Sequence, residues 1–256
     1  MTIKPWREIA IPHNDVLQGS FQQSEFAADI TQVAQGRAHP EYQDARQFFA
    51  RTFITEGMRL LLTAVARRLC GLGGEPVIQL QTAFGGGKTH TMLAVYHLAN
   101  HHDRTQQLEG IPTLLDQAGI SDLLRARVAV LDGINLSVSR GKAHGDITAH
   151  TLWGELAWQL AGADGYALVD AEDKSGTAPG KDTLIALLQQ AAPCVVLIDE
   201  LQKYFSDLSQ EGLPADSFAA NIKFIQALTE AFKAVPTAVL LASLPASLLK
   251  SGAGFD

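Results

Sequence analysis

The chain has 256 residues, of which 46% are hydrophobic and 18% are charged, and its formal net charge is −7. This composition is that of a globular protein with a sizeable core, and it excludes a disordered chain. The acidic balance argues against a broad basic surface, so we do not expect the chain to bind nucleic acid directly. The two cysteines, Cys70 and Cys194, lie far apart, which argues against a disulfide framework or a zinc site.

The N-terminal sequence MTIKPWREIAIPHND lacks the apolar region of a secretion signal. No stretch approaches the run of about 18 uninterrupted apolar residues that a membrane-spanning helix needs. We therefore expect a cytoplasmic protein that makes no membrane contact.

Residues 1–75 are expected to form an N-terminal helical extension. Within it, residues 24–36 predict a short helix that Ser24 caps and Gly36 ends. Pro40 opens a second helical region, which ends at the breaker CGLGGEP. Apolar residues recur there at helical spacing: Met58, Leu61, Leu62, Val65 and Leu69.

From Pro76 onward, short apolar runs alternate with amphipathic stretches. The runs predict strands at residues 77–82, 127–132, 194–200 and 237–243, and the stretches between them predict helices at 89–102, 147–162 and 217–235. Residues 170–182 are polar and contain glycine and proline, which predicts a surface loop. Strands that alternate with helices favour a parallel sheet with helices on both faces, so we predict an α/β core over residues 76–256.

The segment QTAFGGGKTHT, residues 81–91, joins the first predicted strand to the first core helix. It matches the end of the phosphate-binding pattern G-x-x-x-x-G-K-[ST], although Thr82 replaces the first glycine. Glycines let backbone N–H groups approach a phosphate chain, Lys88 would reach the β- and γ-phosphates, and the Thr89 hydroxyl would bind Mg²⁺. The alternative is a glycine-rich turn between a strand and a helix that binds no ligand.

The run CVVLIDE places two carboxylates at the end of a buried strand. Open α/β sheets bind their ligands at the carboxyl ends of the strands. There Asp199 would hold Mg²⁺, and Glu200 would orient and deprotonate an attacking water. The alternative is a strand that ends in a solvated acidic turn. Together with the glycine loop, the two carboxylates favour a P-loop NTPase that hydrolyses its nucleotide.

The order of the predicted strands narrows this class. One strand, residues 127–132, lies in sequence between the strand of the glycine loop and the strand of the carboxylates. This insertion favours the AAA-like ATPases with a catalytic glutamate, in which the following strand lies in space between the two motif strands. Here that strand is residues 237–243, and Ser243 at its end would sense the γ-phosphate. The alternative is a serine that merely ends a strand.

Other polar residues lie near the predicted site. His90 and His97 are seven residues apart on the first core helix, and we interpret them as a boundary face of that helix rather than as a metal site. Asp132 and Asn135 close the second strand, and a direct role for them stays open. The sequence does not select an arginine finger.

Five segments together resemble a known family: HNDVLQGSFQQSEFAADI, QTAFGGGKTHT, TLWGELAWQLAG, CVVLIDELQKY and LLASLPAS. They are similar to large AAA-type P-loop ATPases of unknown function in bacterial phage-defence and restriction-modification gene clusters, often beside DNA methyltransferases and helicases. In that family the loop typically reads T-[GA]-F-G-G-G-K-T-H, so Thr82 would be typical and not a defect. One departure is Gln202, where the family tends to carry an aromatic residue.

Carried over by position, the resemblance implies that Lys88 binds phosphate, that Thr89 and Asp199 bind Mg²⁺, and that Glu200 activates the water. We therefore predict a nucleotide-binding loop of seven residues: Phe84, Gly85, Gly86, Gly87, Lys88, Thr89 and His90. The predicted catalytic residues are Glu200, Lys88 and Ser243. Family members are several times longer, so we expect this chain to be an N-terminal part that lacks the last core strand and the helical lid.

Two functions fit these residues. The first is Mg²⁺-dependent ATP hydrolysis in a DNA-related defence system, by a homo-oligomer that has DNA-modifying or helicase proteins as partners. The second is a switch that binds nucleotide in order to recruit partners and has negligible turnover. Glu200 favours hydrolysis. The motif alone does not separate ATP from GTP.

Overall fold

A parallel sheet of four strands forms the centre of the computed structural model, which describes residues 4–5, 9–12, 14–19, 28–82, 87–100, 105–136, 141–208 and 217–245. In spatial order the strands are β1 (Val77–Thr82), β6 (Ala238–Pro245), β5 (Cys194–Asp199) and β2 (Arg127–Asp132). All four predicted strands are therefore present. The strand that comes last in the described chain lies between β1 and β5.

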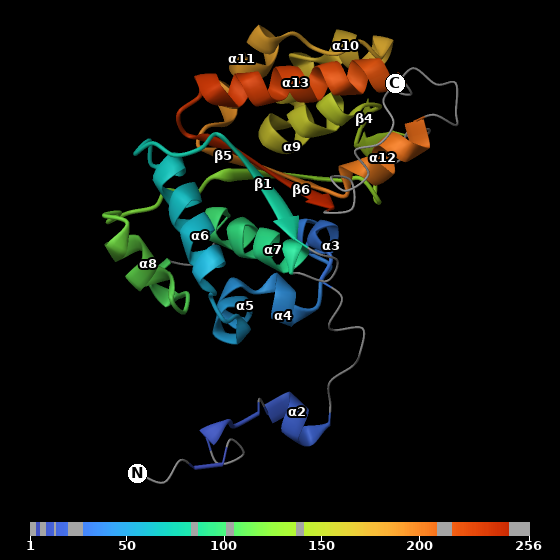
Figure 1. The fold of residues 1–256 in the computed structure, drawn as a ribbon. Helices are drawn as coiled ribbons and strands as arrows, with labels where there is room; N and C mark the ends of the chain where they lie inside the picture. Colours follow the sequence, from blue (N-terminus) through green and yellow to red (C-terminus); the bar gives the residue numbers. More distant parts are fainter. Residues whose placement is uncertain are drawn as a thin grey trace, which may run out of the picture.

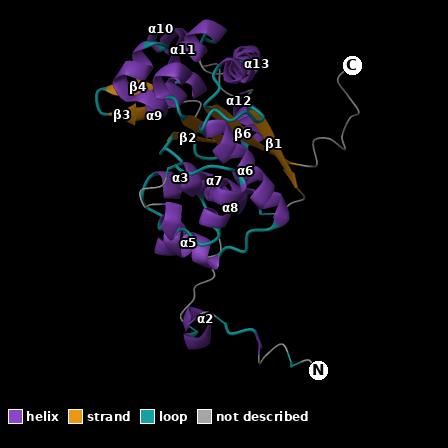
Figure 2. Ribbon diagram, turned by 90° about the vertical axis from the view of Figure 1, so that its left-hand side faces the viewer, coloured by secondary structure: helices purple, strands orange, loops and turns teal. Residues whose placement is uncertain are grey.

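Helices cover both faces of the sheet (Figures 1 and 2). One face carries α6 (Glu56–Leu69), α7 (Lys88–Ala99) and α8 (Ile111–Gln117), and the other carries α9 (Leu152–Ala167), α11 (Lys181–Ala191) and α13 (Phe218–Ala234). Buried side chains form one cluster on each face, and β5 supplies both, with Val195 in the first and Val196 in the second. A strand buried on both faces is typical of a parallel sheet with two helical layers. The predicted α/β architecture is confirmed.

The first helices of the chain are short: α2 (Asn14–Gln18), α3 (Ile30–Ala34), α4 (Pro40–Gln43) and α5 (Ala45–Arg51). In both views α2 stands apart from the sheet and its helices (Figures 1 and 2). The others do not form a layer of their own, because Ile30 and Phe48 belong to the same buried cluster as α6 and α7. The helices between residues 30 and 69 thus share their core with the sheet, and the domain boundary at residue 75 stays a prediction.

The helix expected at residues 24–36 is shorter in the structure. It is α3, which begins at Ile30 because Asp29 caps it, accepting hydrogen bonds from the N–H groups of Thr31 (2.8 Å) and Gln32 (3.2 Å). The expected cap, Ser24, lies outside the described residues. The predicted stop is present, since Gly36 adopts a φ of 69° just after the helix ends.

Two segments differ from the sequence-based expectation. A hairpin of β3 (Lys142–His144) and β4 (Ile147–Ala149) occupies the start of the expected helix at 147–162, because its first residues, ITA, are partly β-branched and pair with β3. The expected loop at 170–182 contains α10 (Asp170–Ser175) and the start of α11. Polarity alone marks that run as exposed. In the structure, however, the Asp173 carboxylate is buried and accepts hydrogen bonds from other parts of the chain.

Two further short elements complete the described fold, η2 (Thr105–Gln107) and α12 (Leu201–Leu208). α12 follows β5 directly, so it starts at the carboxyl edge of the sheet. Among the described residues, no helix is both long enough and apolar enough to cross a membrane.

A buried guanidinium joins α6 to the far side of the sheet. Arg68 is 8% exposed and donates hydrogen bonds to the carbonyl oxygens of Phe232 (2.8 Å), Val235 (2.9 Å), Ala238 (3.0 Å) and Gly74 (3.2 Å). Two of these carbonyls lie at the end of α13, where a positive charge suits the helix dipole. Arg68 therefore satisfies carbonyl groups of the chain reversal between α13 and β6.

We expect the substitution Arg68→Met to lower the free energy of unfolding by about 2–4 kcal/mol, because it leaves several buried carbonyl groups without donors. Chemical denaturation measures this difference. The comparison is Arg67→Met, one residue away on the exposed side of α6. Arg67 donates to the carbonyl oxygens of Ala118 and Leu72 in less buried surroundings, where water can replace it, so its loss should cost less than about 1 kcal/mol. Equal losses in the two variants would contradict the assigned role of Arg68.

Candidate functional site

The carboxyl ends of β5 and β6 meet the start of α7 at one edge of the sheet. Asp199, the last residue of β5, is 5% exposed. Its Oδ2 accepts a hydrogen bond from the Thr89 hydroxyl (3.3 Å), and its Oδ1 accepts hydrogen bonds from the Ser243 hydroxyl and from the N–H group of Glu200 (3.1 Å). The structure thus brings four of the predicted site residues together around one carboxylate.

The strand order produces this contact. β6 pairs with β1 on one side and with β5 on the other, which is the placement that the sequence predicts for the strand after the carboxylates. Ile198 and Ala242 are partners in the β5–β6 register, so the next residues, Asp199 and Ser243, continue side by side. Ser243 is 2% exposed. Its hydroxyl is therefore directed at Asp199 by the register and by burial.

The start of α7 borders the site, next to the carboxyl ends of β5 and β6. Gly87 precedes the helix with a φ of 74°, a left-handed conformation that glycine adopts readily, and it has no side chain to cap the first turn. Lys88 is half-buried and makes no ion pair with the described residues. Phe84, Gly85 and Gly86 lie outside the described residues, so their predicted contacts with phosphate stay predictions.

Glu200 has an unusual backbone conformation. Its φ is 49°, and it is the only non-glycine residue with a positive φ in the described part of the chain. Such a conformation costs about 1–3 kcal/mol and persists where the surroundings hold it. A close neighbour is Gly133, because a Cβ atom there would lie 2.1 Å from the carbonyl oxygen of Glu200. The Glu200 side chain is 3.5 Å from the amide nitrogen of Gln202, a long hydrogen bond.

Asp132 organises the turn that follows β2. It is 8% exposed, and its Oδ1 accepts a hydrogen bond from the N–H group of Ile134 (2.9 Å). Its Oδ2 accepts from the side-chain amide of Asn135 (2.6 Å) and from the Thr31 hydroxyl (2.8 Å). The sequence analysis singles out Asp132 and Asn135 but misses Thr31, because 101 positions separate Thr31 from Asp132 and no motif links them.

His90 and His97 face α4 and α5. The His90 Nε2 is 3.0 Å from the Thr52 hydroxyl, and the His97 Nε2 is 2.8 Å from the Tyr42 carbonyl oxygen. The ring of Phe48 contacts both imidazoles, with centroid distances of 4.6 and 5.0 Å. Burial lowers the pKa of His90, and it lowers the pKa of His97 to about 4. The rings pack between helices, and the predicted contact of His90 with nucleotide stays a prediction.

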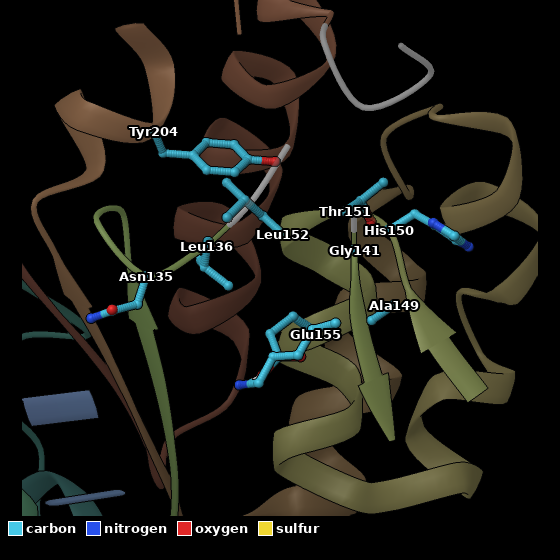
Figure 3. A pocket seen from close by; sticks show the side chains of 10 residues that line it. Asn135, Leu136, Gly141, Ala149, His150, Thr151, Leu152, Glu155 and Tyr204 are labelled. Atoms are coloured by element: carbon cyan, nitrogen blue, oxygen red, sulfur yellow. Dashed lines mark hydrogen bonds and ion pairs between the residues drawn. The ribbon is translucent and has the colours of Figure 1, made fainter. Parts of the chain in front are cut away.

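A second group of charged side chains lies at a small pocket between the turn after β2, the β3–β4 hairpin, α9 and α12 (Figure 3). Its lining includes Tyr204 and Asn135 on one side and His150 and Thr151 on the other. Glu155 is 1% exposed there, forms an ion pair with Lys142 (2.6 Å), and lies with its Oε2 2.6 Å from the Nε2 atom of His144. Because these groups satisfy one another, they hold the hairpin against α9 and do not require a ligand.

Comparison with known proteins assigns a family. Residues 3–254 match the family model described as the DUF499 N-terminal domain, and this match spans nearly the whole chain. The chain belongs to this family. No curated protein and no solved structure matches it at a significant level. The description of the DUF499 N-terminal domain states no activity.

The buried His97 should make the stability of this DUF499 N-terminal domain depend on pH. Its folded pKa of about 4 lies below the ordinary value, so the unfolded chain takes up the proton first as the pH falls. We expect the free energy of unfolding to fall by about 2 kcal/mol between pH 6.5 and pH 5 from this residue alone. Denaturant titrations at several pH values measure the slope.

The variant His97→Gln lacks the titrating ring. Between pH 6.5 and pH 5, its free energy of unfolding should therefore change less steeply with pH than that of the wild type, by about 1.4 kcal/mol per pH unit. Burial also lowers the pKa of His90, so part of the slope of unfolding free energy against pH remains in His97→Gln. A profile of His97→Gln parallel to that of the wild type would show that His97 is not the source.

Proposed function

We propose that this chain binds ATP together with Mg²⁺ at the edge formed by α7, β5 and β6, and that it hydrolyses the ATP. The observation that carries the proposal is the contact of Thr89 and Ser243 with the buried Asp199. The strand order β1-β6-β5-β2, with the glycine loop after β1, adds support. We accordingly propose the AAA-like P-loop class as the finer identity of this α/β fold.

The donor chemistry of the site fits Mg²⁺. The Thr89 hydroxyl and the Asp199 Oδ2 atom lie 3.3 Å apart and would supply two oxygen ligands. Protein sites for Mg²⁺ commonly use one or two carboxylates and take their other ligands from substrate phosphates and water. Among the described residues, no group of three His, Cys, Asp or Glu side chains could hold a metal ion. When bound, Mg²⁺ would neutralise charge on the transferred phosphoryl group.

The residues of the chain divide the work of hydrolysis. Lys88 and the first N–H groups of α7 would bind the β- and γ-phosphates. Glu200 would accept a proton from water while the water oxygen bonds to the γ-phosphorus. The bond between that phosphorus and the bridging oxygen breaks, which yields ADP and inorganic phosphate. Ser243, through its contact with Asp199, would link the γ-phosphate to β6.

The wider role in this proposal rests on the resemblance of the motifs to ATPases of phage-defence gene clusters. We propose that hydrolysis serves a DNA-related defence system and that the chain acts as an oligomer. DNA-modifying or helicase proteins are the proposed partners. The net charge of −7 favours such protein partners over direct contact with DNA.

Release of inorganic phosphate from ATP tests the proposal. Glu200→Gln should lower kcat by about 10²–10⁴-fold with little loss of ATP binding, because it removes only the proton acceptor. Lys88→Ala should weaken ATP binding by about ten- to a hundredfold, because it removes a charged donor to phosphate. Steady-state phosphate release and equilibrium binding of ATP and GTP measure these effects.

The control is Lys223→Ala, which changes an exposed lysine on α13 and should leave both quantities unaltered. A wild-type protein that binds ATP tightly but releases no more phosphate than Glu200→Gln would favour the nucleotide switch over the hydrolase. A wild-type protein that binds no nucleotide would exclude both functions.

The dependence on Mg²⁺ gives a separate prediction. Thr89→Val removes the hydroxyl and keeps the shape of the side chain, so the Mg²⁺ concentration for half-maximal phosphate release should rise by about tenfold or more. Thr89→Ser keeps the hydroxyl and should restore most of the Mg²⁺ affinity. A chelator should stop phosphate release in the wild type. If Thr89→Val and wild type gave the same Mg²⁺ titration, Thr89 would not be a ligand.

A further inference from the structure

The chain around Glu200 lies directly on the turn that follows β2. Asp132 and Asp199 are partners in the β2–β5 register, so both strands end at the same level. The N–H group of Gly133 donates a hydrogen bond to the carbonyl oxygen of Asp199 (2.9 Å). A Cβ atom on Gly133 would lie 2.1 Å from the carbonyl oxygen of Glu200 and 3.2 Å from the Cα atom of Leu201. The position of Gly133 therefore limits where the Glu200 backbone can lie.

Asp132 fixes the position of Gly133. Its side chain accepts hydrogen bonds from Ile134 and Asn135, and its carbonyl oxygen accepts two more from the N–H groups of Asn135 and Leu136, both 3.1 Å. Gly133 thus lies in a turn whose following residues donate hydrogen bonds to Asp132. The turn that contains Gly133, and against which Glu200 lies, is therefore tied to Asp132 by four hydrogen bonds.

The N-terminal helix α3 holds this carboxylate from outside the sheet. Its Thr31 hydroxyl donates to Asp132 Oδ2 at 2.8 Å. Ile30 and Val33, each 1% exposed, anchor α3 in the buried cluster that also contains α7. The capping bonds of Asp29 fix the first turn of α3 and so the place from which the hydroxyl points. A short helix near residue 30 is therefore connected to the backbone of Glu200 through one hydrogen bond and one turn.

We propose that α3 sets the position of Glu200 for hydrolysis, with Thr31, Asp132 and Gly133 as positioning residues that do not touch the substrate. The inference rests on the proposed function, since it assigns Glu200 as the proton acceptor. Hydrolysis then depends on the docking of α3: when the Thr31 hydroxyl leaves Asp132, the turn relaxes and Glu200 departs from its position. Binding of ATP, which uses α7 and Lys88, does not depend on this connection.

The test compares kcat with the KM for ATP in the full 256-residue chain. Thr31→Val keeps the shape of the side chain and removes its donor, so kcat should fall by about threefold to tenfold at nearly unchanged KM. Thr31→Ser restores the donor and should recover most of the lost kcat. Gly133→Ala inserts a Cβ atom against Glu200 and should lower kcat by about a hundredfold. Gln32→Ala, an exposed residue of the same helix, is the matched control.

The Glu200→Gln background separates positioning from general damage. Because both variants act through Glu200, Thr31→Val and Gly133→Ala should change the residual rate of Glu200→Gln by less than about twofold. The proposal is overturned if Thr31→Val leaves kcat unchanged or raises KM without lowering kcat. It is also overturned if Thr31→Val lowers the residual rate of Glu200→Gln by the same factor as it lowers the rate of the wild type. In those outcomes the wild type still hydrolyses ATP and the proposed function stands. A wild type without hydrolysis overturns both.

Discussion

A carboxylate that is buried without a cationic partner is stable only where hydrogen-bond donors surround it. Asp199 meets this condition with donors from three directions: α7 through Thr89, β6 through Ser243, and its own chain through the N–H group of Glu200. These donors converge only if β6 lies beside β5 and α7 begins at the same edge. The hydrogen bonds of Asp199 therefore depend both on the order of the strands and on where α7 begins.

Two other buried charges in the described chain, those of Glu155 and Arg68, are satisfied differently. Glu155 meets the positive charge of Lys142, and Arg68 meets four carbonyl oxygens. Asp173 has neutral donors as Asp199 does, but it is 0% exposed, and a Cβ atom on Gly154 would lie only 2.1 Å from it. It is closed to any ligand.

Asp199 and Asp132 both combine neutral donors with a small exposure at the sheet edge, but only Asp199 has a long hydrogen bond among these, at 3.3 Å. Lys88, at the start of the adjacent helix, has no carboxylate partner among the described residues. In the proposed function, the Asp199 carboxylate and the Lys88 ammonium, neither of which forms an ion pair with the described residues, suit a ligand that carries both signs. A divalent cation bound to a phosphate chain is such a ligand.

The sequence predicts the sheet and the pairing of its motifs because these depend on local patterns. Apolar runs of strand length mark β1, β2, β5 and β6. The insertion of one strand between the motifs favours the AAA-like class, in which the following strand lies between the two motif strands, as β6 does here. Contacts made by single residues across long stretches of chain leave no such pattern. The Thr31–Asp132 hydrogen bond, the burial of Asp173 and the positive φ of Glu200 arise from tertiary packing, which a periodicity or a motif does not encode.

The N-terminal helices contact both flanks of the candidate site. On one flank, Phe48 and the carbonyl group of Tyr42 hold α7 through His90 and His97, and α7 carries Thr89 at its start. On the other flank, α3 holds the turn after β2 through Thr31. Ile30 of α3 and Phe48 of α5 belong to one buried cluster, so the two contacts are made from one packed group of helices. In the proposed mechanism, α4 and α5 therefore support the helix that carries the ligand to Mg²⁺, and α3 supports the acceptor of the water proton.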